Sequence, residues 1–202
     1  MSINSLNLAK RLNSIIFDSK EQRSRISQIK GVLLNFNMKN RYLLISPCRN
    51  EEMYMRRTID SVLSQTIRPS KWVIVDDGST DSTPIILKEY AENYDWIEVV
   101  TRKDRGHRAV GPGVVDAFYS GLETENIDNF DFICKLDLDL ILPHLYFEIL
   151  MRRMDENQRI ATCSGKAYIF KGEKLVNEGH GDETSLGMTK FYRVSNFKEI
   201  GG

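Results

Sequence analysis

Three groups of polar residues have the types and spacing needed to bind a charged ligand. The first is Asp137-Leu138-Asp139, which follows an apolar segment. Alternate residues of an extended segment point the same way, so both carboxylates can face one side. Two close carboxylates repel each other unless a cation lies between them, and oxygen ligands suit hard divalent cations such as Mg²⁺ and Mn²⁺. The spacing therefore indicates a metal site, although such tripeptides also occur in solvated turns.

The second group is the run Asp76-Asp77-Gly78-Ser79-Thr80-Asp81, which also follows an apolar segment. Its carboxylates could accept hydrogen bonds from a base N–H or from ribose hydroxyls, and Gly78 lets the backbone come close to a ligand. The other interpretation is a turn followed by a helix cap, where Asp and Ser are common. The two interpretations are compatible.

The third group is basic, with Arg102, Lys103, Arg105 and Arg108 placed around Gly106. A compact basic loop at the edge of a parallel sheet could neutralise a diphosphate. A solvated charged loop is the alternative for each of these residues.

A fourth polar cluster lies near the end of the chain and consists of Glu178, His180, Asp182 and Glu183. Three of the four side chains are carboxylates on a glycine-containing stretch, so a metal site is conceivable. A mobile surface loop is the interpretation that we prefer for this cluster.

Apolar runs alternate with segments of helical periodicity between Tyr42 and Met154. The pattern predicts strands at 42–45, 72–75, 96–100 and 130–134, and helices at 51–63, 83–90, 114–122 and 143–154. Asn50 is the expected N-cap of the first helix. Residues 160–170 are strand-like, whereas 172–187 read as a polar, glycine-containing stretch.

Repeated strand–helix units imply an α/β fold with a mainly parallel sheet flanked by helices. In such sheets the ligand binds beyond the carboxyl ends of the strands. The polar clusters at 47–51, 76–81 and 137–139 all follow predicted strands. We therefore expect them to form one shared site.

Composition excludes several classes of protein. The chain has 202 residues, with 28 basic and 28 acidic side chains, and this balance argues against nucleic-acid binding through a basic field. No apolar run approaches the roughly 18 residues of a membrane span, and no secretory signal is recognisable. Cys48, Cys134 and Cys163 lack C-x-x-C spacing, which is typical of reduced thiols and of a cytoplasmic protein.

The first 40 residues differ from the rest of the chain in charge. They carry seven basic and two acidic side chains, a net charge of +5, and 1–37 has amphipathic helical periodicity. We interpret 1–40 as a helical extension that docks on the domain, is loosely ordered, or contacts the inner face of an anionic membrane. Met38 is an alternative natural start to Met1.

The ordered set of motifs resembles the family-2 glycosyltransferases. The resemblance is carried by Ile45–Glu51, Val73–Asp81, Lys135–Asp139, Phe191–Arg193 and Phe197–Gly202. Each motif is weak alone, but the set at this spacing is specific, and it spans about four-fifths of the chain. It implies the GT-A fold, in which a nucleotide-binding α/β half joins an acceptor-binding half.

The resemblance also implies an activity. Members of the family transfer a sugar from a nucleotide-diphospho-sugar to the hydroxyl of an acceptor such as a saccharide or a lipid-linked molecule. They usually need Mg²⁺ or Mn²⁺, and the implied stereochemistry is inversion. Polysaccharide or glycoconjugate synthesis is the implied setting, and neither the base nor the sugar of the donor follows from the sequence.

Matched by position, donor-binding roles fall on residues of the first two motifs. The resemblance implies that Pro47, Arg49 and Glu51 line the nucleotide pocket. It also implies that Asp76 and Asp77 are the carboxylates that bind the base and the ribose. Arg105 and Arg108 of the basic loop are further candidates for the diphosphate.

Metal and acceptor roles fall on the later motifs. The resemblance implies that Asp137 lies near the ribose and the metal, that Asp139 ligates the metal, and that Tyr192 and Arg193 belong to the acceptor side. The family's catalytic base follows the glycine pair that Gly201-Gly202 matches. We therefore expect a fragment with a complete donor half in 41–202, a truncated acceptor half, and its base beyond Gly202.

Three other classes of protein were weighed. A sugar-nucleotidyltransferase usually carries a glycine-rich loop after the first strand, and Ser46–Glu51 holds no glycine. A phosphoacceptor domain needs an acidic pair there, where Arg49 and Asn50 stand instead. A non-catalytic module that binds nucleotide and metal remains the main alternative to an active enzyme.

Overall fold

The computed structural model describes residues 41–202 except 105, 107–110 and 180–184, so the predictions for 1–40 lie outside the described part. The described elements run in the order β1 (Tyr42–Cys48), α3 (Met55–Leu63), β2 (Lys71–Asp76), α4 (Thr83–Asn93), β3 (Ile97–Thr101), α5 (Pro112–Leu122), η1 (Ile127–Asn129), β4 (Phe132–Leu136), α6 (Tyr146–Glu156), β5 (Thr162–Cys163), β6 (Tyr168–Lys171), β7 (Lys174–Asn177), β8 (Thr189–Arg193) and α7 (Val194–Glu199). Among the described residues, no helix is long and apolar enough to cross a membrane.

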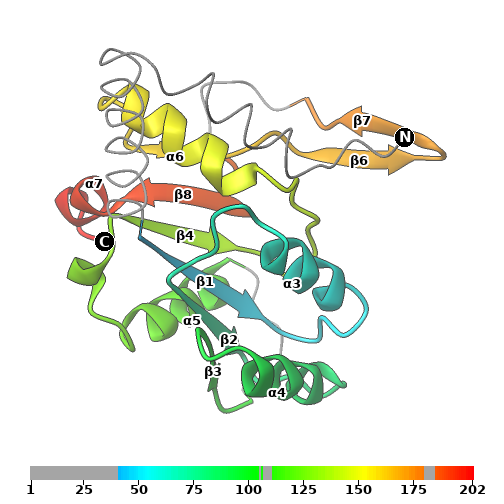
Figure 1. Ribbon diagram of the computed structural model, residues 1–202. Helices are drawn as coiled ribbons and strands as arrows, with labels where there is room; N and C mark the ends of the chain where they lie inside the picture. The colour runs from blue at the N-terminus through cyan, green and yellow to red at the C-terminus, as the bar shows by residue number, and fades with distance from the viewer. Residues whose placement is uncertain (1–40, 105, 107–110, 180–184) are drawn as a thin grey trace, which may run out of the picture. The chain divides into compact units, whose positions relative to one another are not determined.

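Six strands form one twisted sheet in the order β3-β2-β1-β4-β8-β5 (Figure 1). The four strands from β3 to β4 are parallel, and β8 pairs antiparallel with both β4 and β5. The predicted α/β fold with a mainly parallel sheet is confirmed. Parallel pairing of β1 with β2 and β4 brings the carboxyl ends of these strands to one edge of the sheet.

Alternate residues of the strands contribute to two hydrophobic cores, one on each face of the sheet. Tyr42, Leu44 and Trp72 point to the face covered by α3, α4 and α6. Leu43 and Ile45 point to the opposite face, which α5 and α7 cover. Since both faces are buried, β1 is a continuous apolar run through Ile45, as a central parallel strand requires.

The structure corrects several predicted boundaries. The helix after β1 begins at Met55, with Tyr54 as its N-cap, and Asn50 stands outside it with a positive φ of 57°. The predicted cap at Asn50 is therefore wrong. Part of the segment read as a polar stretch, 174–177, is a strand that pairs with β6 in a separate hairpin.

Helix α5 lies directly against the sheet because Gly121 has no side chain. A Cβ atom at this position would stand 2.7 Å from Cγ2 of Val75 and 3.0 Å from Cγ2 of Ile45. Both neighbours are branched residues in the buried sheet, so neither can move aside easily. The helix–sheet distance in this part of the core thus depends on glycine.

We predict that Gly121→Val lowers the free energy of unfolding by about 1–3 kcal/mol, because the added atoms overpack the core. Urea unfolding followed by circular dichroism measures the change. Gly187→Val is the matched control, since nothing lies within 4 Å of a Cβ built there. An equal loss in both variants would contradict this account of the α5 contact.

Candidate functional site

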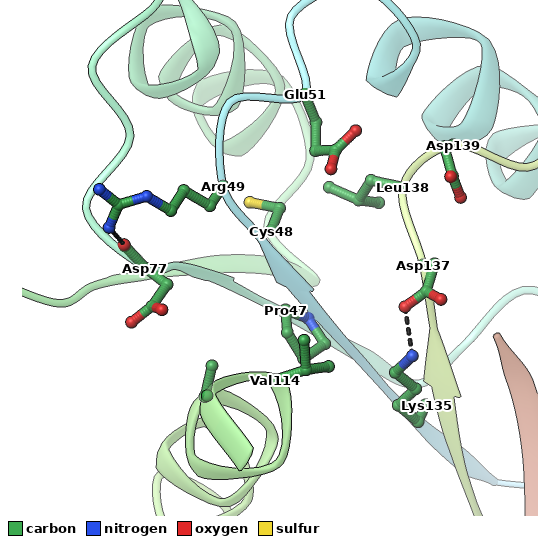
Figure 2. Close-up of a pocket in the computed structure, with 12 residues that line it drawn as sticks. Pro47, Cys48, Arg49, Glu51, Asp77, Val114, Lys135, Asp137, Leu138 and Asp139 are labelled. Carbon is green, nitrogen blue, oxygen red and sulfur yellow. Dashed lines mark hydrogen bonds and ion pairs between the residues drawn. The ribbon is translucent and has the colours of Figure 1, made fainter. Parts of the chain in front are cut away.

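The loops that follow β1, β2 and β4 meet around one cavity at the carboxyl edge of the sheet. The cavity measures about 230 Å³. Six of the residues singled out in the sequence line it, namely Pro47, Arg49, Glu51, Asp77, Asp137 and Asp139. They come from three segments that are far apart in the chain, and Figure 2 shows their side chains around the shared space.

Arg49 connects the loops after three different strands. Its Nη1 donates a hydrogen bond to the backbone oxygen of Asp77 at 2.7 Å. Its Nη2 forms an ion pair with Oδ1 of Asp104, also at 2.7 Å. The guanidinium presents its donors in a fixed planar fork, so it sets the spacing of these loops as well as adding charge. Arg49 is therefore part of the wall of the cavity and of its framework.

Hydrogen bonds between the segments that follow β1 and β2 fix the position of Glu51. The Asn50 side chain accepts from the backbone N–H of Thr80 at 2.8 Å, and the Asn50 N–H donates to Oγ of Ser79 at 2.9 Å. The Glu51 N–H donates to Oγ1 of Thr83 at 2.9 Å. These bonds explain the left-handed conformation of Asn50, which suits a side chain that bonds locally.

The two adjacent carboxylates of the second motif have different environments. Asp77 lines the cavity, and its Oδ1 lies 3.1 Å from Nη1 of Arg102. Asp76 is only 1% exposed, and its Oδ1 accepts from the backbone N–H of Ser79 at 2.9 Å. Asp76 was expected to contact the nucleotide-sugar donor, and we revise its role to support of the turn after β2.

Gly78 allows the loops after β2 and β3 to touch. Its φ is +76°, and a Cβ atom there would stand 2.5 Å from the Cα of Asp104. A side chain would therefore collide with backbone and also strain the local conformation. The backbone that comes close to Gly78 is therefore that of Asp104 in the same chain, whereas the sequence suggested a close approach to a ligand.

Asp137 and Asp139 leave the end of β4 with Leu138 buried between them (Figure 2). Asp137 is half-buried and ion-paired with Lys135, whereas Asp139 is exposed. Two accessible carboxylates suit a hard cation that takes its other ligands from phosphate and water. The described residues contain no cluster of three or more His, Cys, Asp or Glu side chains that could hold a metal by themselves.

A second, more apolar cavity of about 410 Å³ adjoins the first, and Val114 and Lys135 line both. Tyr192 lines the second cavity. Arg193 lies on the other face of β8, where it bonds the backbone oxygen of Met154 at 2.8 Å and packs over the ring of Phe132. Arg193 and Tyr192, both expected on the acceptor side, thus point to opposite faces of β8, because adjacent strand residues alternate.

Several remaining candidates lie outside the described residues, among them Arg105, Arg108 and three of the four members of the last polar cluster, His180, Asp182 and Glu183. Sequence reasoning missed the contribution of Lys135 to the cavity, although the charged residue two places before Asp137 was a signal. It also did not assign Cys48, which lines the cavity at the end of β1.

The three cysteines are free thiols, as the sequence predicted. Burial raises the pKa of Cys48 well above its ordinary value, and the nearby carboxylates, Asp76 foremost, raise it further. Burial also raises the pKa of Cys163, to about 11. A thiol with a raised pKa is mostly protonated at neutral pH and is a poor nucleophile. Cys48 is thus suited to packing at the site and not to covalent chemistry.

The arrangement of the sheet and its carboxylates defines a class of protein. Carboxylates at the carboxyl ends of parallel strands, with β8 antiparallel beside them, match the GT-A nucleotide-diphospho-sugar transferases. The family model for glycosyl transferase family 2 matches residues 43–200, and the chain belongs to this family. The family expected from the sequence is confirmed.

Known proteins support the same assignment. Chondroitin synthase from Escherichia coli is 33% identical over 141 residues, which cover 65% of this chain and 20% of that protein. The chain spans about a third or less of the length of the curated relatives that it matches. The crystal structure of S. aureus TarS 1-349 superposes with a TM-score of 0.61 and 22% identity, covering 79% of this chain and 49% of that one.

A mannosyltransferase from Pyrobaculum calidifontis, PcManGT, was solved with GDP-Man and Mn²⁺. It superposes with a TM-score of 0.58 and 16% identity, over 81% of this chain and 47% of that chain. At 22% and 16% identity, these two structures establish the fold of the chain and nothing more.

We predict that Arg49→Met lowers the free energy of unfolding by about 1.5–3 kcal/mol, because the charge-assisted hydrogen bonds that join the loop after β1 to the loops after β2 and β3 are lost. Chemical denaturation measures the change. Arg57→Met on the exposed side of α3 is the matched control and should be nearly neutral. Equal stability of wild type and Arg49→Met would show that the guanidinium does not hold the loops together.

We also predict that Cys48 resists alkylation in the folded protein, because its pKa is raised and it is buried. Its thiolate fraction stays below that of a free cysteine at neutral pH and rises only in alkaline solution. Peptide mass spectrometry after timed exposure to N-ethylmaleimide, with and without urea, measures the rate. Rapid native labelling would contradict the protonated, buried state.

Proposed function

We propose that this chain is the donor-binding part of an enzyme that transfers a sugar from a nucleotide-diphospho-sugar to an acceptor hydroxyl, with inversion and with the help of Mg²⁺ or Mn²⁺. Polysaccharide or glycoconjugate synthesis is the setting that we propose. The observation that carries the proposal is the meeting of Arg49, Glu51, Asp77, Asp137 and Asp139 around one cavity at the carboxyl edge of the parallel sheet. Ligands bind at this edge in open α/β sheets.

The residues of the cavity suggest a division of roles. Asp77 lies deep in the loop after β2, where its carboxylate can accept from a ribose hydroxyl or a base N–H. Pro47 forms an apolar part of the wall, and Arg49 and Arg102 place positive charge near the carboxylates. Such a mixture suits a nucleotide, which combines an apolar base with hydroxyls and a diphosphate.

Asp137 and Asp139 are the proposed holders of the divalent cation. When bound, the cation would supply Lewis-acid stabilisation of the departing diphosphate. Lys135 already neutralises part of the charge of Asp137 and lies within reach of both cavities. We propose that it keeps the charge near the leaving group balanced.

The second cavity is the proposed acceptor side, with Tyr192 on its wall. It adjoins the donor cavity through Val114 and Lys135, so an acceptor there would face the donor sugar. A saccharide or a lipid-linked molecule are the acceptor classes that we propose. The residue that takes the proton from the acceptor hydroxyl is expected after Gly201-Gly202, as the family resemblance implies.

Nucleotide binding tests the proposal directly. TarS was solved with UDP and with UDP-GlcNAc, and PcManGT with GDP-Man and Mn²⁺, so UDP and GDP are the first probes. We predict that one of them binds with Mn²⁺ present, and that Asp139→Asn weakens this binding at least about tenfold, because it removes a charged ligand. Isothermal titration calorimetry measures both affinities.

Asp95→Asn is the matched control, because Asp95 is an exposed carboxylate outside the cavity. Its affinity should equal that of the wild type. Failure of the folded wild type to bind either nucleotide would overturn the proposed donor site.

A further inference from the structure

The β6–β7 hairpin is separate from the main sheet and extends away from it beyond α6 (Figure 1). Its strands pair antiparallel, with Tyr168 opposite Asn177 and Phe170 opposite Leu175. A turn at Gly172, whose φ is +66°, closes the tip. A hairpin with only two strands is marginally stable in water, so this one is expected to gain from a further contact.

Large apolar side chains of the hairpin face solvent. Phe170 is 74% exposed, Leu175 58% and Tyr168 53%. Side chains alternate between the two faces of a strand, which places these three on one face of the ribbon. Ile169, Lys171 and Lys174, also exposed, lie on the other face. Single exposed apolar residues are ordinary, but a group gathered on one protruding element marks an interaction surface.

The charges at the tip narrow the choice of partner. Lys171 stands directly opposite Lys174, and both residues are exposed. Like charges directly opposite each other destabilise a hairpin, so an anionic surface would relieve this pair. Glu173 at the turn is the only acidic residue between Tyr168 and Asn177, so the tip keeps a net positive charge.

We propose that the β6–β7 hairpin docks on an anionic lipid bilayer. Tyr168, Phe170 and Leu175 would enter the boundary between headgroups and acyl chains, where aromatic side chains are favoured. Lys171 and Lys174 lie on the opposite face of the ribbon beside the turn, and they would bind lipid phosphates as the tip of the hairpin enters the headgroup layer. Pairing with a second copy is less favoured, because it would bring two basic tips together.

Vesicle flotation of the full chain tests the docking. The wild type should float with phosphatidylglycerol-containing vesicles and much less with phosphatidylcholine vesicles, and salt should weaken its binding. Replacing Phe170 and Leu175 together by Ser should lower the partition coefficient by about tenfold or more, because two apolar anchors are lost. The pair Lys171→Gln and Lys174→Gln should lower it by about fivefold for each lysine and reduce its salt dependence.

The matched control combines Ile85→Ser and Lys88→Gln on α4. Ile85 is 72% exposed, close to the 74% of Phe170, but it lies on a helix that packs on the sheet. This control should float like the wild type, and all variants should keep the wild-type melting temperature. The docking does not depend on the proposed sugar transfer, since the readout is binding to vesicles.

Three results would overturn the proposal. One is a wild type that fails to float with anionic vesicles, and another is equal flotation of the wild type and both hairpin variants. The third is a dimer, seen by analytical ultracentrifugation, that the Phe170 and Leu175 substitutions dissociate without affecting flotation. That result would assign the hairpin to contact with a second copy of the chain.

Discussion

The guanidinium of Arg49 is the contact on which the candidate site depends most. The parallel sheet brings the ends of β1, β2 and β3 to one edge, and backbone bonds from the Asp77 N–H to Cys48 and from the Arg102 N–H to Asp76 extend the pairing to the start of the loops that follow. Arg49 ties the first loop to the backbone of Asp77 and to the carboxylate of Asp104. The cavity wall is thus held by the same charged groups that would meet a ligand.

Much of this arrangement follows from the sequence. Apolar runs such as Tyr42–Ile45 are characteristic of buried parallel strands, and polar residues directly after them must gather at one edge. The order of strands and polar segments therefore predicts that Pro47, Glu51 and Asp139 lie together. This prediction succeeds because strand direction, which fixes the edge, depends on the order of elements and not on side-chain detail.

Details that depend on tertiary contacts could not be read from the pattern. Adjacent aspartates look equivalent in the sequence, but Asp76 turns inward to cap Ser79 whereas Asp77 faces the cavity. Arg193 was grouped with Tyr192, although the strand alternation rule would have placed them on opposite faces. Residues 160–170 are strand-like in the sequence, but the strand at Lys174–Asn177 is not evident there, because glycine and charged residues stand beside its short apolar pair.

The central claim is that a nucleotide diphosphate and a divalent cation bind in the cavity formed by the loops after β1, β2 and β4. The most direct test is a crystal structure of the chain grown with Mn²⁺ and the nucleotide that calorimetry selects. The account predicts an anomalous manganese peak beside Asp137 and Asp139, with the nucleotide in contact with Asp77. A fully occupied nucleotide at another surface, or manganese bound away from both carboxylates, would contradict it.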